Sequence, residues 1–408
     1  MSYFTDFVRG FLDLGATVIL PVVIFLLGLF FRQKIGAAFR SGLTIGVAFV
    51  GIFLVIDLLV KNLGVSLNVI DVGWPATSSI AWASSVAAFI IPLGIIVNVV
   101  LLVTKVTKTM NVDIWNFWHY TFTAAMVYAV SGSIWQALLA AVIFQVICLK
   151  VADWTAPMMS EFFDLPGVSI ATGSTISYAP GIYLVKLLQR VPGLNKLDAD
   201  PETIQKRFGA FGESIFVGLI LGLGIGVLAG YKPGDIINLG MSMAAVMVLM
   251  PRMVKILMEG LMPVSESART WLNKRFGEHE IYIGLDAAVA LGHPAVISTA
   301  LILVPITVLL AVILPGNQVL PFGDLATIPF VVAFIVGAAR GNIIHSVIVG
   351  TIMIAISLYI ATDVAPIFTD MAKGTNVQMP KGSSEISSID QGGNIVNYLI
   401  FKLFSLFN

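Results

Sequence analysis

Two short stretches of the sequence place polar side chains next to apolar segments. The first, "DVGWPATSSIAWASS", carries an indole and several hydroxyl groups, on Trp74, Thr77, Ser78 and Ser79. Each hydroxyl can donate and accept a hydrogen bond, which suits a neutral polyol, and the indole offers a flat face to C–H groups. Small hydroxyl residues also let membrane helices approach closely, so ligand binding and helix packing fit the serines equally well.

The second stretch, "IGLDAAVALGHPAV", places Asp286 and His293 close together in the chain. Ionisable groups beside apolar segments are costly unless they serve a site or cap a helix, and here we favour a functional role over capping. Asp113 and Asp324 each precede an apolar segment, where an N-cap and a ligand contact fit equally. We expect His119 to point into the protein interior.

These residues belong to a chain with little wettable surface. Of its 408 residues, 58% are hydrophobic and 11% are charged, whereas a soluble domain carries about 25% charged residues. Most of the outer surface must therefore face a lipid bilayer. The formal net charge is 0, so nothing indicates a nucleic-acid partner.

Hydropathy predicts an all-α polytopic membrane protein with about 11 spans, since runs of about 20 apolar residues mark spanning helices. Two shorter stretches, 72–82 and 284–293, contain Pro, Gly, Ser or Asp, and we expect them to form re-entrant hairpins. The expected spans are residues 14–31, 43–60, 86–104, 117–131, 134–151, 213–230, 236–254, 295–314, 325–339, 343–361 and 393–407.

An internal repeat relates the two halves of the chain. The segment "GSIWQALLAAVIFQVICLKVADWTAPMMSEF" from Gly132 aligns with "GNIIHSVIVGTIMIAISLYIATDVAPIFTDM" from Gly341, and Asp113 lies near the counterpart Asp324. Ordered matches of this kind predict two repeats of five spans and a hairpin each. Because five is odd, the second repeat is inverted relative to the first.

The distribution of basic residues supports the inversion through the positive-inside rule. If the N-terminus lies outside, the Lys and Arg residues fall on cytoplasmic segments with the exceptions of Arg9, Lys61, Lys232, Lys373 and Lys381. Inverted repeats with broken helices are typical of transporters, which bind their ligand near the bilayer midplane. We therefore expect the two hairpins to meet at a substrate site.

Along nearly its whole length the chain resembles the galactitol family of membrane components of the phosphoenolpyruvate-dependent phosphotransferase system. That family is distantly similar to the ascorbate phosphotransferase transporter. The matching stretches are "LDLGATVILPVVI", "VDVGWPATSSIAWAS", "NVDIWNFWHYTFT", "QKRFGAFGE", "GLDAAVALGHPAV", "PGNQVLPFGDLATIPF" and "SSIDQGG".

The resemblance implies a homodimer in the inner membrane that works as an elevator. It implies a V-shaped dimerisation domain at 1–65 and 208–262 and a core substrate domain at 66–185 and 279–372. The remaining segments would be cytoplasmic connectors at 186–207 and 263–278 and a C-terminal segment at 373–408.

The resemblance also implies a role. The chain would bind a sugar alcohol, galactitol first, and carry it inward for phosphorylation by a separate IIB protein that receives its phosphoryl group from IIA. The single cysteine, Cys148, lies in a predicted span, so the phosphocysteine must be on that partner, and no cofactor is expected. The implied sugar site comprises Trp74, Thr77, Ser78, Ser79, Asp113, His119, Asp286, His293 and Asp324.

Three other functions remain open. An ion-coupled secondary transporter of polyols would use Asp57, Asp153 and Asp286 as proton or sodium sites. An integral-membrane enzyme would need a catalytic cluster at one interface, whereas the acids here are spread over both repeats. A sensor or scaffold without flux is the most remote of the three.

Overall fold

The computed structural model describes residues 16–60, 69–113, 115–194, 197, 199, 214–228, 230–276, 281–373 and 384–407. Most of these residues are helical, and short strands punctuate the helices. In the first half the elements are α2 (Ala16–Phe30), α3 (Ile35–Val60), β1 (Val69–Asp71), α4 (Gly73–Ala83), α5 (Ala87–Val103), β2 (Thr109–Asn111), η1 (Trp115–Phe117), α6 (Trp118–Ser131), α7 (Ile134–Phe162), β3 (Val168–Ile170), α8 (Gly173–Ser177) and α9 (Pro180–Leu188).

The second half follows a similar order of helices and strands. It ends in a short helix that packs against α6 and α7. Its elements are α11 (Ser214–Leu228), α12 (Pro233–Phe276), β4 (Tyr282–Leu285), η4 (Ala287–Gly292), α13 (Pro294–Ile313), β5 (Val319–Leu320), η5 (Phe322–Thr327), α14 (Ile328–Val331), α15 (Ala333–Ala338), α16 (Ile343–Ala372), β6 (Glu385–Ser387) and α17 (Ile395–Ser405).

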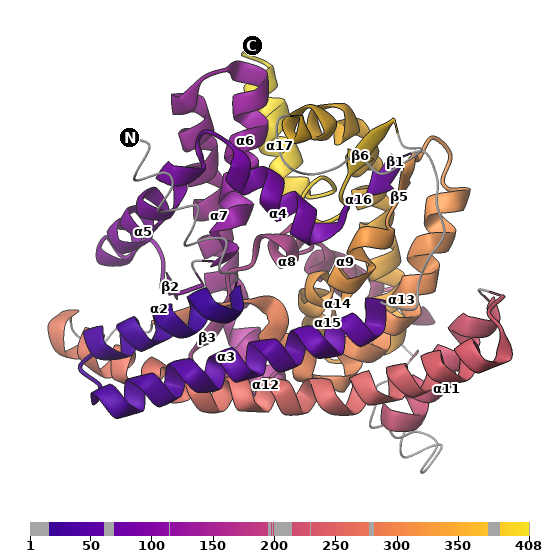
Figure 1. The fold of residues 1–408 in the computed structure, drawn as a ribbon, viewed down its shortest axis with the longest axis horizontal. Helices are drawn as coiled ribbons and strands as arrows, with labels where there is room; N and C mark the ends of the chain where they lie inside the picture. Colours follow the sequence, from indigo (N-terminus) through magenta and orange to yellow (C-terminus); the bar gives the residue numbers. More distant parts are fainter. Residues whose placement is uncertain are drawn as a thin grey trace.

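Helices α2, α3, α11 and α12 pack against one another as one layer, which runs along the lower edge of Figure 1. Glycines allow the close approach. A side-chain carbon added at Gly260 of α12 would lie 2.7 Å from Ile45 and 3.0 Å from the carbonyl oxygen of Ser41 on α3. The remaining elements lie on the other side of α3 and α12 and enclose most of the buried residues.

Helix α12 continues for 44 residues, which is about 66 Å at about 1.5 Å per residue. The predicted span 236–254 and the predicted connector 263–278 are therefore largely parts of one helix. Pro263 removes one backbone bond without ending the helix, because α12 packs along α3. The α2–α3 turn also attaches there, since Gln33 Nε2 donates to the Pro263 carbonyl.

Six short strands correct the all-α prediction. They form two parallel three-stranded sheets with the orders β5-β1-β6 and β2-β4-β3. Each strand lies where the chain runs through the protein interior, and buried backbone groups there need partners. Strands of two to four residues are too short to show an alternating hydropathy pattern, so they could not be predicted from the sequence.

The two sheets combine the halves of the chain in the same way. In each, the central strand comes from one half and both flanking strands from the other. Exchanging β1, β2 and β3 for β4, β5 and β6 converts one order into the other. The registers agree as well, since Val69 faces Val319 in the first sheet and Tyr282 faces Thr109 in the second.

The two predicted hairpins take different forms. Residues 72–82 lie in α4, a regular helix that meets α5 at a bend of 92°. Residues 284–293 form the end of β4 and the 3-10 helix η4. The bend between α4 and α5 fits either a broken span or a re-entrant loop, so the two re-entrant hairpins stay a prediction.

The predicted span 325–339 is wrong as a single helix, because it is divided among η5, α14 and α15. The break leaves backbone groups to be satisfied by other elements. The Thr175 hydroxyl of α8 donates to the Phe330 carbonyl at 2.9 Å. The break also lets the Asp324 turn lie against β1.

Within the described ranges, α7, α13 and α16 are each long and apolar enough to cross a bilayer. The bent pair α4–α5 counts as one further span if taken together, and parts of α2 and α3 and helix α17 are shorter apolar helices. The observed α13 agrees closely with the predicted span 295–314. Helices α7 and α16 extend about three turns beyond their predicted ends at 151 and 361.

Candidate functional site

The ends of β2 and β4 bring two acids together. Asn111 and Gly284 are register partners in these parallel strands, so Asp113 and Asp286, which each follow two residues later, emerge side by side. Asn116 of η1 lies between them. Its amide nitrogen donates to Asp113 Oδ2 at 2.6 Å and also to Asp286 Oδ2.

The other sheet brings together a second pair of acids. Asp71 ends β1, Asp324 follows the neighbouring β5, and the two side chains hydrogen-bond directly to each other. A bond between two carboxyl groups needs a proton on one of them. The pair also receives donors from the segment after β6: Ser388 Oγ at 2.6 Å and the Asp390 backbone N–H at 3.1 Å, both to Asp324 Oδ2.

Two glycines make the second pair possible. Gly73 has φ +73°, and a side-chain carbon there would lie 2.7 Å from the Gly323 carbonyl oxygen. At Gly323 an added carbon would lie 2.4 Å from the Gly73 nitrogen. The backbones therefore touch, which lets the Gly73 N–H donate to Asp71 Oδ1 at 2.8 Å.

Hydrogen bonds connect the two pairs through the centre of the protein. His119 Nδ1 lies 2.8 Å from the Asn116 carbonyl oxygen, and a carbonyl only accepts, so this nitrogen carries the proton. The other ring nitrogen lies 3.1 Å from Ser174 Oγ. Ser174 bonds to the Asp390 carboxylate, and the Asp390 backbone reaches Asp324. We name this series the buried polar chain: Asp113, Asp286, Asn116, His119, Ser174, Asp390, Asp324 and Asp71.

A side branch of amides supports the middle of the buried polar chain. Gln391 Nε2 donates to Asp390 Oδ1 at 3.0 Å and lies 3.4 Å from Ser174 Oγ. Asn397 of α17 donates to Gln391 Oε1 at 2.9 Å and accepts from Thr123 of α6. The branch fixes the segment after β6 between α6, α8 and α17.

The buried polar chain lies almost wholly out of contact with solvent. Its members are buried except Asp286, which is partly exposed. Polar groups at this depth are expensive unless they are paired or serve a ligand. Carboxylates that accept, with an amide and a hydroxyl that donate, form a surface to which the hydroxyl groups of a ligand can bond. Because Asp286 is partly exposed, it is the member of the buried polar chain that a ligand can reach.

The structure brings four of the predicted site residues into the buried polar chain: Asp113, His119, Asp286 and Asp324. Trp74 joins through its backbone, whose N–H donates to Asp324, while its indole packs against the hydrophobic core. Whether any of these residues contacts a sugar stays a prediction.

The other predicted residues lie apart from the buried polar chain or serve the backbone. The Thr77 hydroxyl donates to the Gly73 carbonyl in its own helix at 2.8 Å. Ser78 is buried in α4, and Ser79 is exposed. His293 caps α13, where its Nδ1 accepts from the Ala295 N–H at 3.2 Å.

Sequence reasoning missed half of the buried polar chain. Asp71 stands directly before the first hairpin, Asn116 lies between Asp113 and His119, and Asp390 lies in the stretch "SSIDQGG". Each is a polar residue close in sequence to a predicted site residue or a matching stretch. The sequence does not show which residue it hydrogen-bonds in the fold. Ser174 was harder to find, because no span or hairpin was predicted for its segment, whereas the structure buries it in α8.

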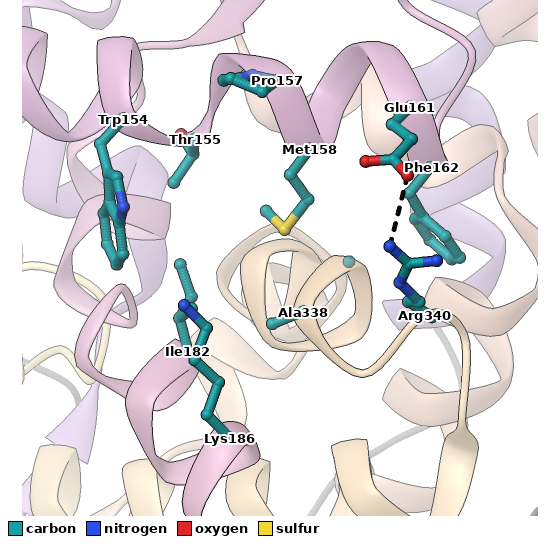
Figure 2. A pocket seen from close by; sticks show the side chains of 11 residues that line it. Trp154, Thr155, Pro157, Met158, Glu161, Phe162, Ile182, Lys186, Ala338 and Arg340 are labelled. Atoms are coloured by element: carbon teal, nitrogen blue, oxygen red, sulfur yellow. Dashed lines mark hydrogen bonds and ion pairs between the residues drawn. The ribbon is translucent and has the colours of Figure 1, made fainter.

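The buried polar chain is separate from the cavity between α7, α9 and α15, and its residues are not grouped as a metal centre. In the part of the chain that the structure describes, no group of three or more His, Cys, Asp or Glu side chains is placed to hold a metal ion. A cavity of about 430 Å³ lies between α7, α9 and α15 (Figure 2). None of the predicted site residues lines it, although its Phe162 stacks on His293 with ring centroids 4.4 Å apart.

Comparison with known proteins agrees with the resemblance seen in the sequence. Residues 10–382 match the family model for the sugar-specific permease component of the phosphotransferase system. The chain is 43% identical to the galactitol-specific EIIC component of Escherichia coli K12, over 98% of this chain and 91% of that protein. It is 39% identical to a putative permease IIC component of the same strain, over 97% and 93% of the two chains. The chain therefore belongs to the sugar-specific permease components of the phosphotransferase system, as a member of the galactitol-type IIC family.

Proposed function

We propose that this protein binds a sugar alcohol at the buried polar chain and moves it across the inner membrane. The carrying observation is the continuous hydrogen-bonded path from Asp286 to Asp71 through an otherwise apolar interior. Both halves of the protein contribute to it. A path of this kind costs stability in a membrane protein, and a polar ligand is the function that explains it.

Galactitol is the first candidate substrate. A hexitol is uncharged and carries hydroxyl groups along its whole length, so it needs alternating acceptors and donors rather than a counter-ion. Asp286 and Asp113 can accept, and the Asn116 amide can donate when the ligand displaces one of its two carboxylate partners. The galactitol-specific relative from Escherichia coli supports the same choice.

We further propose that the two halves are inverted repeats that move as an elevator. The exchange of strands between the two sheets supports the repeat, because a pseudo-two-fold axis would generate that pattern. In this proposal the layer of α2, α3, α11 and α12 serves as the dimerisation domain expected at 1–65 and 208–262. The elements around the buried polar chain serve as the core expected at 66–185 and 279–372, joined by the segment after β6 and α17.

Cysteine cross-linking tests the elevator. A disulfide between η4 and the facing part of α12, which are in contact, should stop transport because it joins the two proposed domains. A control disulfide between Gly51→Cys and Met253→Cys lies inside the proposed fixed layer, where these residues meet. It should leave transport intact, and equal inhibition by both disulfides would contradict the elevator.

The proposal includes partners and orientation. We expect separate IIB and IIA proteins, a homodimer, and an N-terminus outside the cell. A row of exposed apolar side chains on α2 and α3 supplies a surface for lipid or for a second copy; it comprises Val18, Val22, Leu26, Phe30, Ile35, Phe39, Leu43, Val47, Val50 and Leu54. Mass photometry in lipid nanodiscs would establish the dimer, and an N-terminal tag accessible to protease in intact cells would establish the orientation.

Phosphorylation by membranes tests the function as a whole. Membranes containing the protein are combined with purified general carriers, the IIA and IIB components, phosphoenolpyruvate and labelled polyols. We expect phosphoenolpyruvate-dependent phosphorylation of galactitol, and phosphorylation of another polyol instead would change the substrate but not the class. Uptake that ignores phosphoenolpyruvate and collapses with an uncoupler would replace the proposal with an ion-coupled transporter.

A further inference from the structure

The cavity between α7, α9 and α15 is separate from the buried polar chain and has a composition of its own. Figure 2 shows Trp154, Pro157 and Met158 of α7 on one side and Ile182 and Lys186 of α9 opposite. Ala338 of α15 also lines the cavity. The walls are therefore mainly apolar.

Two cations stand at the rim of this cavity. Arg340 reaches Glu161 at 3.3 Å, and both side chains are largely exposed. Lys186 extends along the cavity beside Ile182 and lies 5.7 Å from the Tyr183 ring. Among the residues that the structure describes, no carboxylate forms an ion pair with Lys186. The rim therefore offers an ammonium group, and a guanidinium held by an exposed and weak pair.

Arg340 is held in an unusual backbone conformation, with φ +51°. A left-handed conformation is uncommon for a residue with a side chain, and glycine would adopt it at no steric cost. Gly341 follows directly and is also left-handed, with φ +81°. The guanidinium is therefore placed at this rim at a backbone cost, which favours a role for its charge.

The walls show which kind of ligand fits. The hydroxyl of Thr155, the uncharged polar side chain of the lining, already donates to the Val151 carbonyl at 2.9 Å. A polyol phosphate would find cations for its phosphate but, for its hydroxyl groups, little beyond the Glu161 carboxylate and the Trp154 indole N–H. A molecule with an anionic head and an apolar body fits both the rim and the walls.

The surroundings of the cavity indicate where that molecule comes from. Trp154 stacks on Tyr183 with ring centroids 5.3 Å apart. Their exposed fractions are 42% and 63%, and the neighbouring Leu187 is 60% exposed. Exposed Trp and Tyr side chains collect where helices leave the bilayer. The exposed surface beside the cavity is therefore suited to lipid rather than to water.

We propose that this cavity binds an anionic phospholipid, with its phosphate between Lys186 and Arg340 and an acyl chain against Met158, Ile182 and Ala338. Basic pockets between membrane helices bind anionic head groups by the same chemistry. The bound lipid would join α7, α9 and α15 at the end of the proposed substrate domain. The site is independent of the polyol site.

Fluorescence quenching in nanodiscs tests the proposal on the full-length protein. Phosphatidylglycerol with brominated acyl chains is added as a minor component to unlabelled phosphatidylcholine, and quenching of tryptophan emission is measured. We expect quenching that Trp154→Phe removes, because the bromine then has no indole in the cavity. Brominated phosphatidylcholine in the same background should quench the Trp154 emission at least about tenfold less efficiently.

Charge variants locate the head group. Lys186→Gln and Arg340→Gln should each weaken the preference for the anionic lipid about fivefold, as expected for about 1 kcal/mol per cation. Arg190→Gln is the matched control, since Arg190 is an exposed base one turn further along and does not line the cavity. Glu161→Gln should strengthen binding, because it releases the Arg340 guanidinium.

Three results would overturn the proposal. The first is equal quenching by the anionic and the zwitterionic brominated lipid. The second is an effect of Arg190→Gln as large as that of Lys186→Gln. The third is displacement of the lipid signal by millimolar glycerol phosphate, which would identify the ligand as a soluble phosphate ester.

Discussion

The two carboxylate pairs each lie at strand ends of one sheet and take one acid from each half of the chain, but they are held differently. Between Asp113 and Asp286 an amide donates to both carboxylates. In the second pair the residue at the equivalent spacing is Thr327, three residues after Asp324. Its hydroxyl donates to the Asp324 backbone carbonyl at 2.8 Å, so Asp324 and Asp71 bond directly to each other.

Because of this difference, the Asp113–Asp286 pair can exchange hydrogen-bond partners, whereas the Asp71–Asp324 pair cannot do so readily. Asn116 can give up one acceptor and keep the other, and Asp286 is partly exposed. Asp71 and Asp324 are buried, and backbone and hydroxyl donors hold both Asp71 oxygens and Asp324 Oδ2. We infer that the first pair contacts the sugar and that the second holds the hairpin against η5. Five variants test this comparison.

The largest effect is expected for Asp286→Asn. The amide keeps the shape of the side chain but loses the charged acceptor, and hydrogen bonds to charged groups are worth up to about 3 kcal/mol. Galactitol binding to the purified protein should weaken roughly a hundredfold, measured by equilibrium dialysis. An unchanged melting temperature is the control for folding, and wild-type binding would remove η4 from the site.

Asn116→Ala should rank second. It removes the shared donor and leaves two carboxylates facing each other, so binding should weaken about thirtyfold, corresponding to about 2 kcal/mol. The same dialysis measurement checks it. A lower melting temperature with unchanged galactitol affinity in the folded fraction would show that Asn116 only holds Asp113 and Asp286 together.

Asp324→Asn should have a small effect on binding, no more than about fivefold, because the new amide can donate to Asp71 in place of the shared proton. Asp324→Ala is the contrasting variant. It leaves the Ser388 hydroxyl and the Asp390 N–H without their acceptor and should destabilise the protein by about 2 kcal/mol, seen as a lower melting temperature. If Asp324→Asn impairs binding as much as Asp286→Asn does, the two pairs are equivalent and the comparison fails.

Thr327→Ala should have the smallest effect. The hydroxyl bonds within its own turn, so galactitol binding should stay within about twofold and stability should fall by about 1 kcal/mol at most. Paired with Asn116→Ala, it compares equivalent positions directly. A greater loss of binding in Thr327→Ala than in Asn116→Ala would reverse the assignment of the two pairs.

The sequence predicted those helices whose apolar runs are long enough to be identified from local hydropathy without knowledge of their packing partners. The limits of α13 were correct to one residue, and the starts of α7 and α16 were correct. The sequence could not show the strands, because they are too short to have a hydropathy pattern. Strand β5, for example, has two residues and is recognised only by its pairing with β1. For the same reason it identified Asp113 and Asp286 as candidates without showing that Asn116 joins them.

The interior segments gave the least information. Residues 165–180 lack a long apolar run and contain Gly, Ser and Thr, which is the composition of a loop, yet they supply β3 and the buried Ser174. Their burial depends on contacts with β4 and with the segment after β6, both distant in sequence. Residues that are buried by distant partners leave little trace in local composition.

The interleaving of the two sheets also constrains how the protein is made. When the ribosome has completed the first half, β1, β2 and β3 exist but do not pair with one another, because each pairs only with strands of the second half. Until β4, β5 and β6 are inserted, the backbone N–H and C=O groups of these strands lack their final partners and must be hydrated or bound by a chaperone. Neither half can therefore reach its final form alone in the membrane. Two separately expressed halves should be degraded when produced singly and should accumulate when produced together.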